Sequence, residues 1–139
     1  MRVAEAVEIK LGIEEVWCFA CDPTNDPVWC RKVKSVDRIA PDRWLVHHKP
    51  IPLRPTVVLT VELVSATAPH RLLLREEDDA SVFEVEYRLE ATTSGVRFTQ
   101  ISEFRWKRLP VVVQRLLAPG VRRDIRRQLR DLKRTLEIA

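Results

Sequence analysis

Residues 83–90 read FEVEYRLE, in which every apolar residue lies at an odd position and every charged residue at an even one. Successive side chains of a β-strand point to opposite faces of the sheet, so this alternation predicts a strand with one buried and one solvated face. The same period of two recurs in residues 33–39, 43–49, 57–64, 71–76 and 96–106. Turn-forming residues separate these runs, for example at 40–42 and 92–95. The central sequence therefore predicts six consecutive antiparallel strands.

The N-terminal part predicts one more strand and two short helices. Residues 3–9 place their valines and isoleucine on one parity, which is typical of a half-buried strand. Residues 13–21 carry apolar side chains at the i, i+3, i+4, i+7 spacing of an amphipathic helix. Proline disfavours helical geometry in the residue before it, so Asp22-Pro23 ends this helix. Asp22 or Thr24 can then cap a second short helix that ends near Trp29.

The C-terminal part predicts one long amphipathic helix. Pro119-Gly120 interrupts its pattern, and because an interior proline loses a backbone hydrogen bond we expect a kink or break there. Arginines and a lysine fill the other faces of the helix. The apolar stripe consists of Val113, Leu117, Val121, Ile125, Leu129, Leu132 and Leu136.

Together these elements predict an α+β fold in a single domain, residues 1–139. A seven-stranded antiparallel sheet that is apolar on one face has a single long helix available to cover it, so the sheet should curve around that helix and leave space between them. Residues 49–55 contain three prolines, which favour an extended loop because proline cannot donate to a strand ladder. Ile51 and Leu53 in this loop are candidates for a lid over the space.

The composition limits the classes of function. The 139 residues are 45% hydrophobic and 32% charged, as in an ordered globular protein. A membrane-spanning helix needs about 20 consecutive apolar residues, whereas the longest stretch without a charge is residues 63–70. We therefore expect a cytoplasmic protein with no transmembrane segment. The three glycines, at positions 12, 95 and 120, are too far apart to form either of the common glycine-rich phosphate loops, so we expect no nucleotide-type cofactor. We expect no cofactor of another kind either.

The positive charge is concentrated at the C-terminal end. Residues 105–139 hold 11 Lys and Arg against 3 Asp and Glu, whereas residues 1–104 hold 13 against 17. A nucleic-acid-binding protein would place aromatic or polar base-reading residues among such cations, and no aromatic residue follows Trp106. A solvated helix face is the simplest interpretation, with RNA, ribosome or anionic-membrane contact as the alternative. The cations that would make such a contact are Arg122, Arg123, Arg126, Arg127 and Arg130.

Short motifs in the expected order make the chain resemble the START-like, helix-grip superfamily that includes the major birch-pollen allergen. These motifs are Val7-Glu8-Ile9, Glu15-Val16-Trp17, Asp22-Pro23, Trp29, Gly95-Val96-Arg97 and residues 129–137. Within that superfamily the chain is most similar to the bacterial SRPBCC group of polyketide cyclase/dehydrase and lipid-transport proteins. The resemblance implies a central cavity for a lipid, sterol or polyketide-like ligand. Only some members of the group catalyse cyclisation or dehydration.

Four polar residues, His48, Tyr87, Gln100 and Ser102, lie in the predicted strands at the alternate positions that are otherwise apolar. Their side chains should therefore face the inner side of the sheet, which makes them pocket candidates. A buried polar group costs roughly 1–3 kcal/mol when unpaired, so each must bond to a ligand, to water, to the backbone or to another of the four. The first hypothesis is a cavity that binds a small hydrophobic ligand. The second is a cyclase or aromatase in which His48 transfers a proton and Tyr87 donates a hydrogen bond to a carbonyl. The complete set of candidate ligand-binding residues is Trp29, Trp44, His48, Phe83, Val85, Tyr87, Phe98, Gln100, Ser102, Phe104, Trp106, Val113 and Leu117.

The cysteines and the acidic run do not predict a redox or metal site. Cys18 and Cys21 form a C-x-x-C at the end of a helix, whereas thioredoxin-like chemistry needs it at a helix N-terminus. Zinc would need two further ligands, so we expect core thiols, with Cys30 close to the mouth of the pocket. The run 76–79 lacks the ligand spacing of a calcium loop and predicts a solvated hairpin tip.

Overall fold

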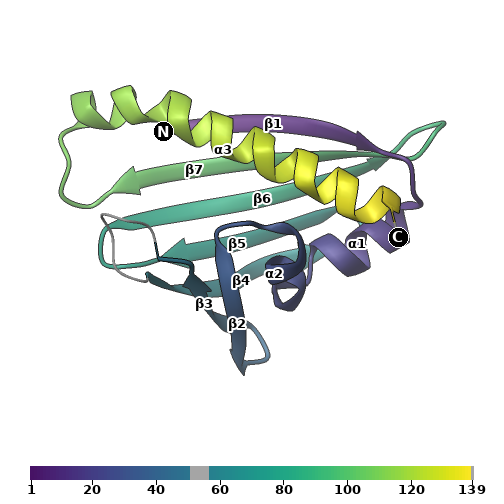
Figure 1. The fold of residues 1–139 in the computed structure, drawn as a ribbon, viewed down its shortest axis with the longest axis horizontal. Helices are drawn as coiled ribbons and strands as arrows, with labels where there is room; N and C mark the ends of the chain where they lie inside the picture. The colour runs from purple at the N-terminus through teal and green to yellow at the C-terminus, as the bar shows by residue number, and fades with distance from the viewer. Residues whose placement is uncertain (51–56, 139) are drawn as a thin grey trace.

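The protein is built on one antiparallel sheet. The computed structural model describes residues 1–50 and 57–138. Within these residues seven strands pair in the order β1-β7-β6-β5-β4-β3-β2 (Figure 1). From β2 to β7 each strand pairs with the next one in the chain, so only the β1–β7 pair joins distant parts of the sequence. The strands are β1 (Arg2–Ile9), β2 (Val33–Ala40), β3 (Arg43–His48), β4 (Val58–Thr67), β5 (Arg71–Glu77), β6 (Ser81–Ala91) and β7 (Val96–Trp106).

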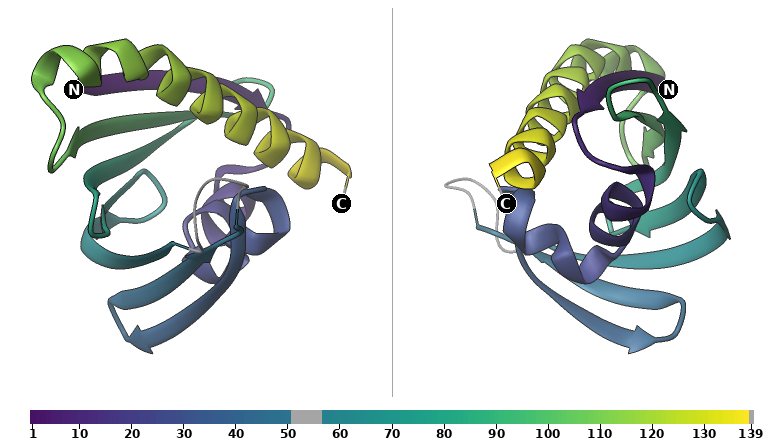
Figure 2. Two further views of the ribbon diagram at one scale, coloured as in Figure 1. Left: turned by 60° about the vertical axis from the view of Figure 1, so that its left-hand side comes forward. Right: turned by 90° about the vertical axis from the view of Figure 1, so that its right-hand side faces the viewer.

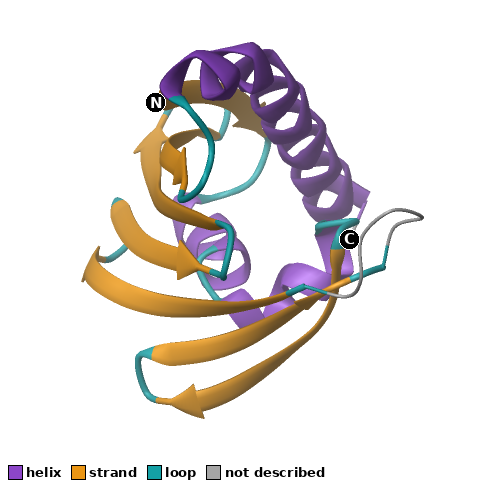
Figure 3. Cartoon of the chain, turned by 90° about the vertical axis from the view of Figure 1, so that its left-hand side faces the viewer, coloured by secondary structure: helices purple, strands orange, loops and turns teal. Residues whose placement is uncertain are grey.

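The helices gather on the concave side of the sheet. Between β1 and β2 lie α1 (Ile13–Ala20), the 3-10 turn η1 (Pro23–Asn25) and α2 (Asp26–Trp29), and α3 (Val111–Ile138) follows β7. The Asp22 carboxylate accepts a hydrogen bond from the Thr24 amide at 3.0 Å, which is the predicted capping interaction. Seen from its end, the sheet bends and α3 crosses its open side (Figure 3). The predicted α+β, helix-grip architecture is confirmed.

Of the kink or break predicted at Pro119, the break is absent, because α3 continues through this residue as one helix. Proline at this position removes the amide that would bond to the carbonyl of Arg115, and its ring crowds the same carbonyl. Arg115 is exposed, so water can satisfy that carbonyl and the helix need not end. None of the described helices is long and apolar enough to cross a membrane.

The core lies between the concave face of the sheet and the second half of α3. Ile125, Leu129, Leu132 and Leu136 of α3 are buried as predicted. The first half of the stripe is not buried: Val113 and Leu117 are 38% and 42% exposed. The physical reason is that α3 is longer than the sheet it covers, and its first turns project beyond the start of β1 (Figures 1 and 2).

Polar contacts on two sides of α3 fasten it to the rest of the fold. Arg31, which follows α2, donates two hydrogen bonds to the buried carboxylate of Asp131, at 2.7 and 3.0 Å. On the opposite side Glu5 of β1 accepts hydrogen bonds from Arg122 and Arg126 at 3.0 and 2.9 Å. These pairs fix the helix across the sheet. The proposed lid residues Ile51 and Leu53 lie outside the described residues.

Candidate functional site

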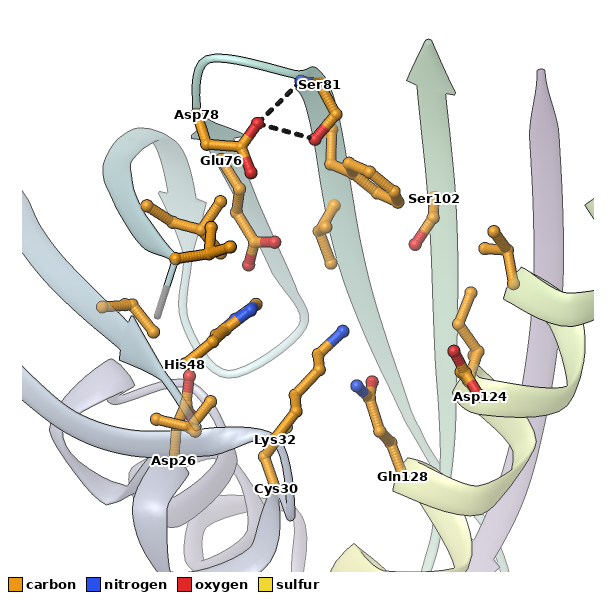
Figure 4. A pocket seen from close by; sticks show the side chains of 18 of the residues that line it. Asp26, Cys30, Lys32, His48, Glu76, Asp78, Ser81, Ser102, Asp124 and Gln128 are labelled. Atoms are coloured by element: carbon orange, nitrogen blue, oxygen red, sulfur yellow. Dashed lines mark hydrogen bonds between the residues drawn. The ribbon is translucent and has the colours of Figure 1, made fainter. Parts of the chain in front are cut away.

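A cavity of about 780 Å³ lies between the concave face of the sheet and helices α2 and α3 (Figure 4). Pockets for small organic ligands usually measure roughly 300–1,000 Å³. The sheet floor of the cavity comes from alternate residues of β6 and β7, which the period of two directs to the same face. Trp29 closes one side from α2, and Val121 and Ile125 close the other from α3. The cavity therefore depends on elements from the whole length of the chain.

Aromatic rings in the cavity wall pack against one another and against rings of the core behind the wall. Phe83 meets Trp106 edge to face, with ring centroids 6.3 Å apart. Behind them Phe104 stacks on Phe83 at 5.2 Å. The ring of Tyr87 lies tilted against that of Phe98 at 5.0 Å. Offset and edge-to-face contacts hold aromatic side chains in fixed orientations, so this wall is preformed.

The structure brings most of the predicted site residues together. Three of the others, Trp44, Phe98 and Phe104, are buried in the core but do not line the cavity. Val113 and Leu117 are not cavity residues either, because they lie in the turns of α3 that project beyond the start of β1 and are partly exposed. The predicted residues that do line it are Trp29, His48, Phe83, Val85, Tyr87, Gln100, Ser102 and Trp106.

Gln100 and Ser102 lie buried side by side on β7, as the parity argument predicted. The Gln100 side-chain amide donates a hydrogen bond to the Ser102 hydroxyl at 3.3 Å. The two residues thus satisfy each other in part, which was the alternative left open by the sequence. The amide oxygen of Gln100 is buried and has no hydrogen-bond partner among the described residues.

The cavity also contains ionisable residues that the sequence analysis missed. Asp26 of α2, Glu76 of β5 and Lys32 direct their side chains into it from three separate segments (Figure 4). The prediction of a solvated hairpin tip at residues 76–79 is wrong for Glu76 and Glu77, because β5 extends to Glu77 and Glu76 lines the cavity. A signal was present: Glu76 has the parity of Leu72 and Leu74, both of which are buried. No comparable periodicity marks Asp26 or Lys32.

Burial governs the protonation of these groups. Desolvation raises the pKa of Glu76, and the charge of Lys32 opposes that rise. Desolvation also raises the pKa of Asp26 well above its usual range, and repulsion from Glu76 and Asp22 adds to the effect. The same causes, desolvation first and then Asp26 and Glu76, raise the pKa of Tyr87. Tyr87 therefore remains protonated and can act as a hydrogen-bond donor.

We expect Glu76→Gln to stabilise the protein more as the pH rises. Because the folded-state pKa of Glu76 is raised, the folded chain binds this proton more tightly than the unfolded chain. Wild-type stability is therefore favoured at low pH and decreases as the pH rises from the ordinary carboxyl range, about pH 4, through the raised pKa. The neutral glutamine of the variant carries no such penalty. The difference in Tm between variant and wild type, measured by circular dichroism across a pH series, should grow towards neutral pH.

Glu84→Gln is the matched control, because Glu84 is exposed on the neighbouring strand β6. It should leave the pH dependence of Tm close to that of the wild type. A Glu76→Gln effect that is the same at all pH values would contradict the desolvation of Glu76.

The three cysteines are free thiols that lie in different surroundings. Among residues 1–50 and 57–138 no group of three or more His, Cys, Asp and Glu side chains is placed to hold a metal ion. The core prediction is wrong for Cys18, which is exposed because it lies on the outer side of α1. Cys30 is buried and lines the cavity, and burial raises the pKa of its thiol to about 11. At neutral pH Cys30 is therefore a protonated, weakly nucleophilic wall residue.

The family of the chain follows from comparison with known proteins. A family model described as polyketide cyclase / dehydrase and lipid transport matches residues 1–137. The chain belongs to this family. Among curated proteins no relative matches it. Membership in the polyketide cyclase / dehydrase and lipid transport family fits a protein that binds a hydrophobic ligand or acts on a polyketide-like one.

Solved structures share the fold over almost the full length of the chain. A protein from Thermus thermophilus is 14% identical with a TM-score of 0.81, and the match covers 99% of this chain and 98% of that one. A START superfamily protein from Mycobacterium smegmatis is 13% identical with a TM-score of 0.79, covering 97% and 98%. A Rhodobacter sphaeroides protein is 19% identical with a TM-score of 0.72, covering 99% and 92%. These similarities confirm the START-like fold.

Proposed function

We propose that the protein binds a small, mostly apolar molecule in the cavity between the sheet and α3. The observation that carries this proposal is the space itself, about 780 Å³ bounded by aromatic and aliphatic walls. Apolar ligand surface removed from water contributes about 25 cal/mol per Å² to binding. The wall residues supply that burial without first having to rearrange, since their rings are already packed against one another.

The polar groups in the cavity orient the ligand. The carboxyl groups of Asp26 and Glu76 form no hydrogen bond or ion pair with another described residue, and both face the interior of the cavity. A ligand with one polar end satisfies them at low cost, whereas a wholly apolar ligand leaves carboxyl groups buried without partners. The ligand class that fits is therefore an apolar body with a hydrogen-bonding or charged end.

The proposal is tested by titrating the protein with N-phenyl-1-naphthylamine and displacing this fluorescent probe with sterol-like, fatty-acid and aromatic polyketide compounds. Because Trp29 and Trp106 line the cavity, binding should also change tryptophan fluorescence. We expect saturable probe binding at one site, and mass spectrometry of the native protein should identify a co-purifying molecule of the same class. A chain that binds neither the probe nor any of the compounds would contradict the proposal.

A second candidate function is acid–base catalysis in the same cavity. It is favoured by the protonated Tyr87 and by carboxyl groups whose pKa values burial raises, because a carboxyl group that holds its proton more tightly than usual can donate it to a substrate. His48 lines the same cavity and is the proposed proton-transfer group. Once a substrate is known, His48→Gln and Tyr87→Phe should abolish turnover and leave probe binding within about a few-fold. Normal turnover in both variants would exclude these roles.

A further inference from the structure

The first two turns of α3 expose an unusual number of large apolar side chains. Val112 and Leu116 are 70% and 76% exposed, and Val111 is 62% exposed. Leu109, in the connection from β7, is exposed beside them. Single exposed apolar residues are common, but a contiguous apolar patch usually marks a binding surface. We call this set, Leu109, Val111, Val112 and Leu116, the apolar tip.

The apolar tip continues into a row of arginines on the same face of α3. Successive helix residues are about 100° apart, and on this geometry Val112 and Leu116 lie opposite the buried Gln114. The positions that follow on this outer face are Arg123, Arg127 and Arg130. Residues of the inner face, such as Ile125 and Leu132, are buried. The outer face of α3 is thus apolar at its beginning and cationic along the rest of its length.

These outer arginines are available for a partner. Among the described residues Arg123, Arg127 and Arg130 form no ion pair, whereas Arg122 and Arg126 on the side of the helix pair with Glu5. Arg108 and Arg115, which flank the apolar tip, are also without an acidic partner among the described residues. The local excess of positive charge is therefore not neutralised by the protein itself.

The apolar tip is held in a defined position by Gln114. Its side-chain amide donates hydrogen bonds to the carbonyls of Trp106 and Leu109, at 3.1 and 2.7 Å. Its side-chain oxygen accepts one from the amide of Trp106, at 3.2 Å. Gln114 itself is buried, so it fastens the connection from β7 to the first turns of α3. The patch is a structured surface, and little conformational freedom is lost when a partner covers it.

We propose that this face of α3 docks on an anionic lipid bilayer. The apolar tip enters the boundary between headgroups and acyl chains, and Arg123, Arg127 and Arg130 lie against the lipid phosphates. An apolar segment continued by unpaired cations is the pattern of a helix that binds a membrane surface, with apolar burial and electrostatic attraction acting together. Only the beginning of α3 inserts into the bilayer, because the outer face is cationic along the rest of the helix and the inner face stays packed on the sheet.

Charge distinguishes the bilayer from the other possible partners. If a second copy of the chain covered this face, the unpaired arginines beside the two apolar tips would lie near one another, and repulsion between like charges would oppose that contact. RNA would neutralise the arginines but would leave the apolar tip in water, and no aromatic residue follows Trp106 to stack on bases. An anionic bilayer satisfies both parts of the face.

The same surface is adjacent to one side of the cavity. Arg108 and Leu109, at the start of the apolar tip, both line the cavity, and Val121 lines it from the next turns of α3. Docking as proposed places this part of the cavity rim close to the bilayer. The docking proposal itself rests on the exposed face of α3 and is independent of which ligand the cavity holds.

The test is co-sedimentation of the full chain with vesicles of phosphatidylcholine alone and of equal parts phosphatidylcholine and phosphatidylglycerol. We expect binding to the anionic vesicles, with affinity that decreases as salt is added. Leu116→Glu should lower the partition coefficient at least about tenfold, because it replaces an apolar side chain that would be buried on docking. Arg123→Glu together with Arg127→Glu should lower it about tenfold or more at low salt.

Ile39→Glu is the matched control, since Ile39 is also an exposed aliphatic residue, 54% exposed, but lies on β2 away from α3 (Figure 1). It should bind anionic vesicles like the wild type. All the substituted residues are exposed, and circular dichroism will show that the variants fold.

Each of these results would overturn the proposal: no binding to anionic vesicles at low salt, equal binding to both kinds of vesicle, wild-type binding by Leu116→Glu, or binding to a polyuridine oligomer without vesicle binding. A dimer in sedimentation velocity that Leu116→Glu converts to a monomer would also overturn it, by assigning the face to a second copy of the chain.

Discussion

Gly95→Ala should lower the free energy of unfolding by about 3 kcal/mol, since overpacking against rigid surroundings typically costs 1–3 kcal/mol and this contact is with backbone. A Cβ atom at residue 95 would lie 2.0 Å from the carbonyl oxygen of Ile9 and 3.0 Å from the Cα atom of Lys10. The contact is at the end of the β1–β7 pair, where Ile9 lies opposite Val96. Neither backbone can withdraw without separating β1 from the sheet. Thermal and urea denaturation measure the loss.

Gly120→Ala is the opposite case and serves as the control. Gly120 lies within α3, and the nearest atom to an added Cβ is the end of the Arg123 side chain at 4.0 Å. Alanine is favoured over glycine in a helix by roughly 0.5–1 kcal/mol, so this variant should be slightly more stable than the wild type. Equal effects of the two substitutions would show that the close approach at Gly95 does not constrain the fold.

Val85→Trp should reduce the affinity for N-phenyl-1-naphthylamine at least about tenfold. Val85 is in the middle of β6, opposite Ser102 of β7, and lines the cavity. An indole at this position occupies space that the ligand would otherwise fill, and losing on the order of 60 Å² of apolar contact corresponds to roughly tenfold in affinity. Because the new side chain extends into a cavity of about 780 Å³, it has room without displacing the core.

The matched control is Val64→Trp, which makes the same change at an exposed position of β4 outside the cavity. It should bind the probe like the wild type, measured by the same fluorescence titration. If Val85→Trp retains full affinity and circular dichroism shows the native fold, the ligand binds elsewhere and the cavity proposal is wrong. If only the control loses affinity, the binding site is on the outer surface of the sheet.

The period of two made the strands predictable because it reflects local backbone geometry. In a strand every second side chain faces the same way whatever the strand pairs with, so residues 83–90 indicate a one-sided sheet without any knowledge of their neighbours. The same reasoning placed Tyr87, Gln100 and Ser102 on the inner face correctly. It would also have found Glu76, the last residue of the predicted strand 71–76, which follows Leu72 and Leu74 at the alternate positions of the inner face, if the run 76–79 had not been interpreted as solvated.

Helical periodicity showed which side of α3 faces the sheet, but it did not show how much of that side the sheet covers. The stripe from Val113 to Leu136 does follow one side of α3, yet only its second half is covered by the sheet. Whether a stripe residue is buried depends on how far β1 and β7 extend beneath it. The length of the helix relative to these strands is not a local property of the helix sequence. For this reason Val113 and Leu117, which were expected in the cavity wall, are exposed.

The sequence alone determined the order of the elements, the inner parity of the strands and the concentration of positive charge after residue 104, since each depends on neighbouring residues in the chain. Only the tertiary structure decided that Asp26, Lys32 and Glu76 enter one cavity, because α2, the segment after it and β5 meet there across long separations in sequence. The raised pKa values follow from that meeting, since desolvation depends on all the atoms that surround a group and not on its position in the chain.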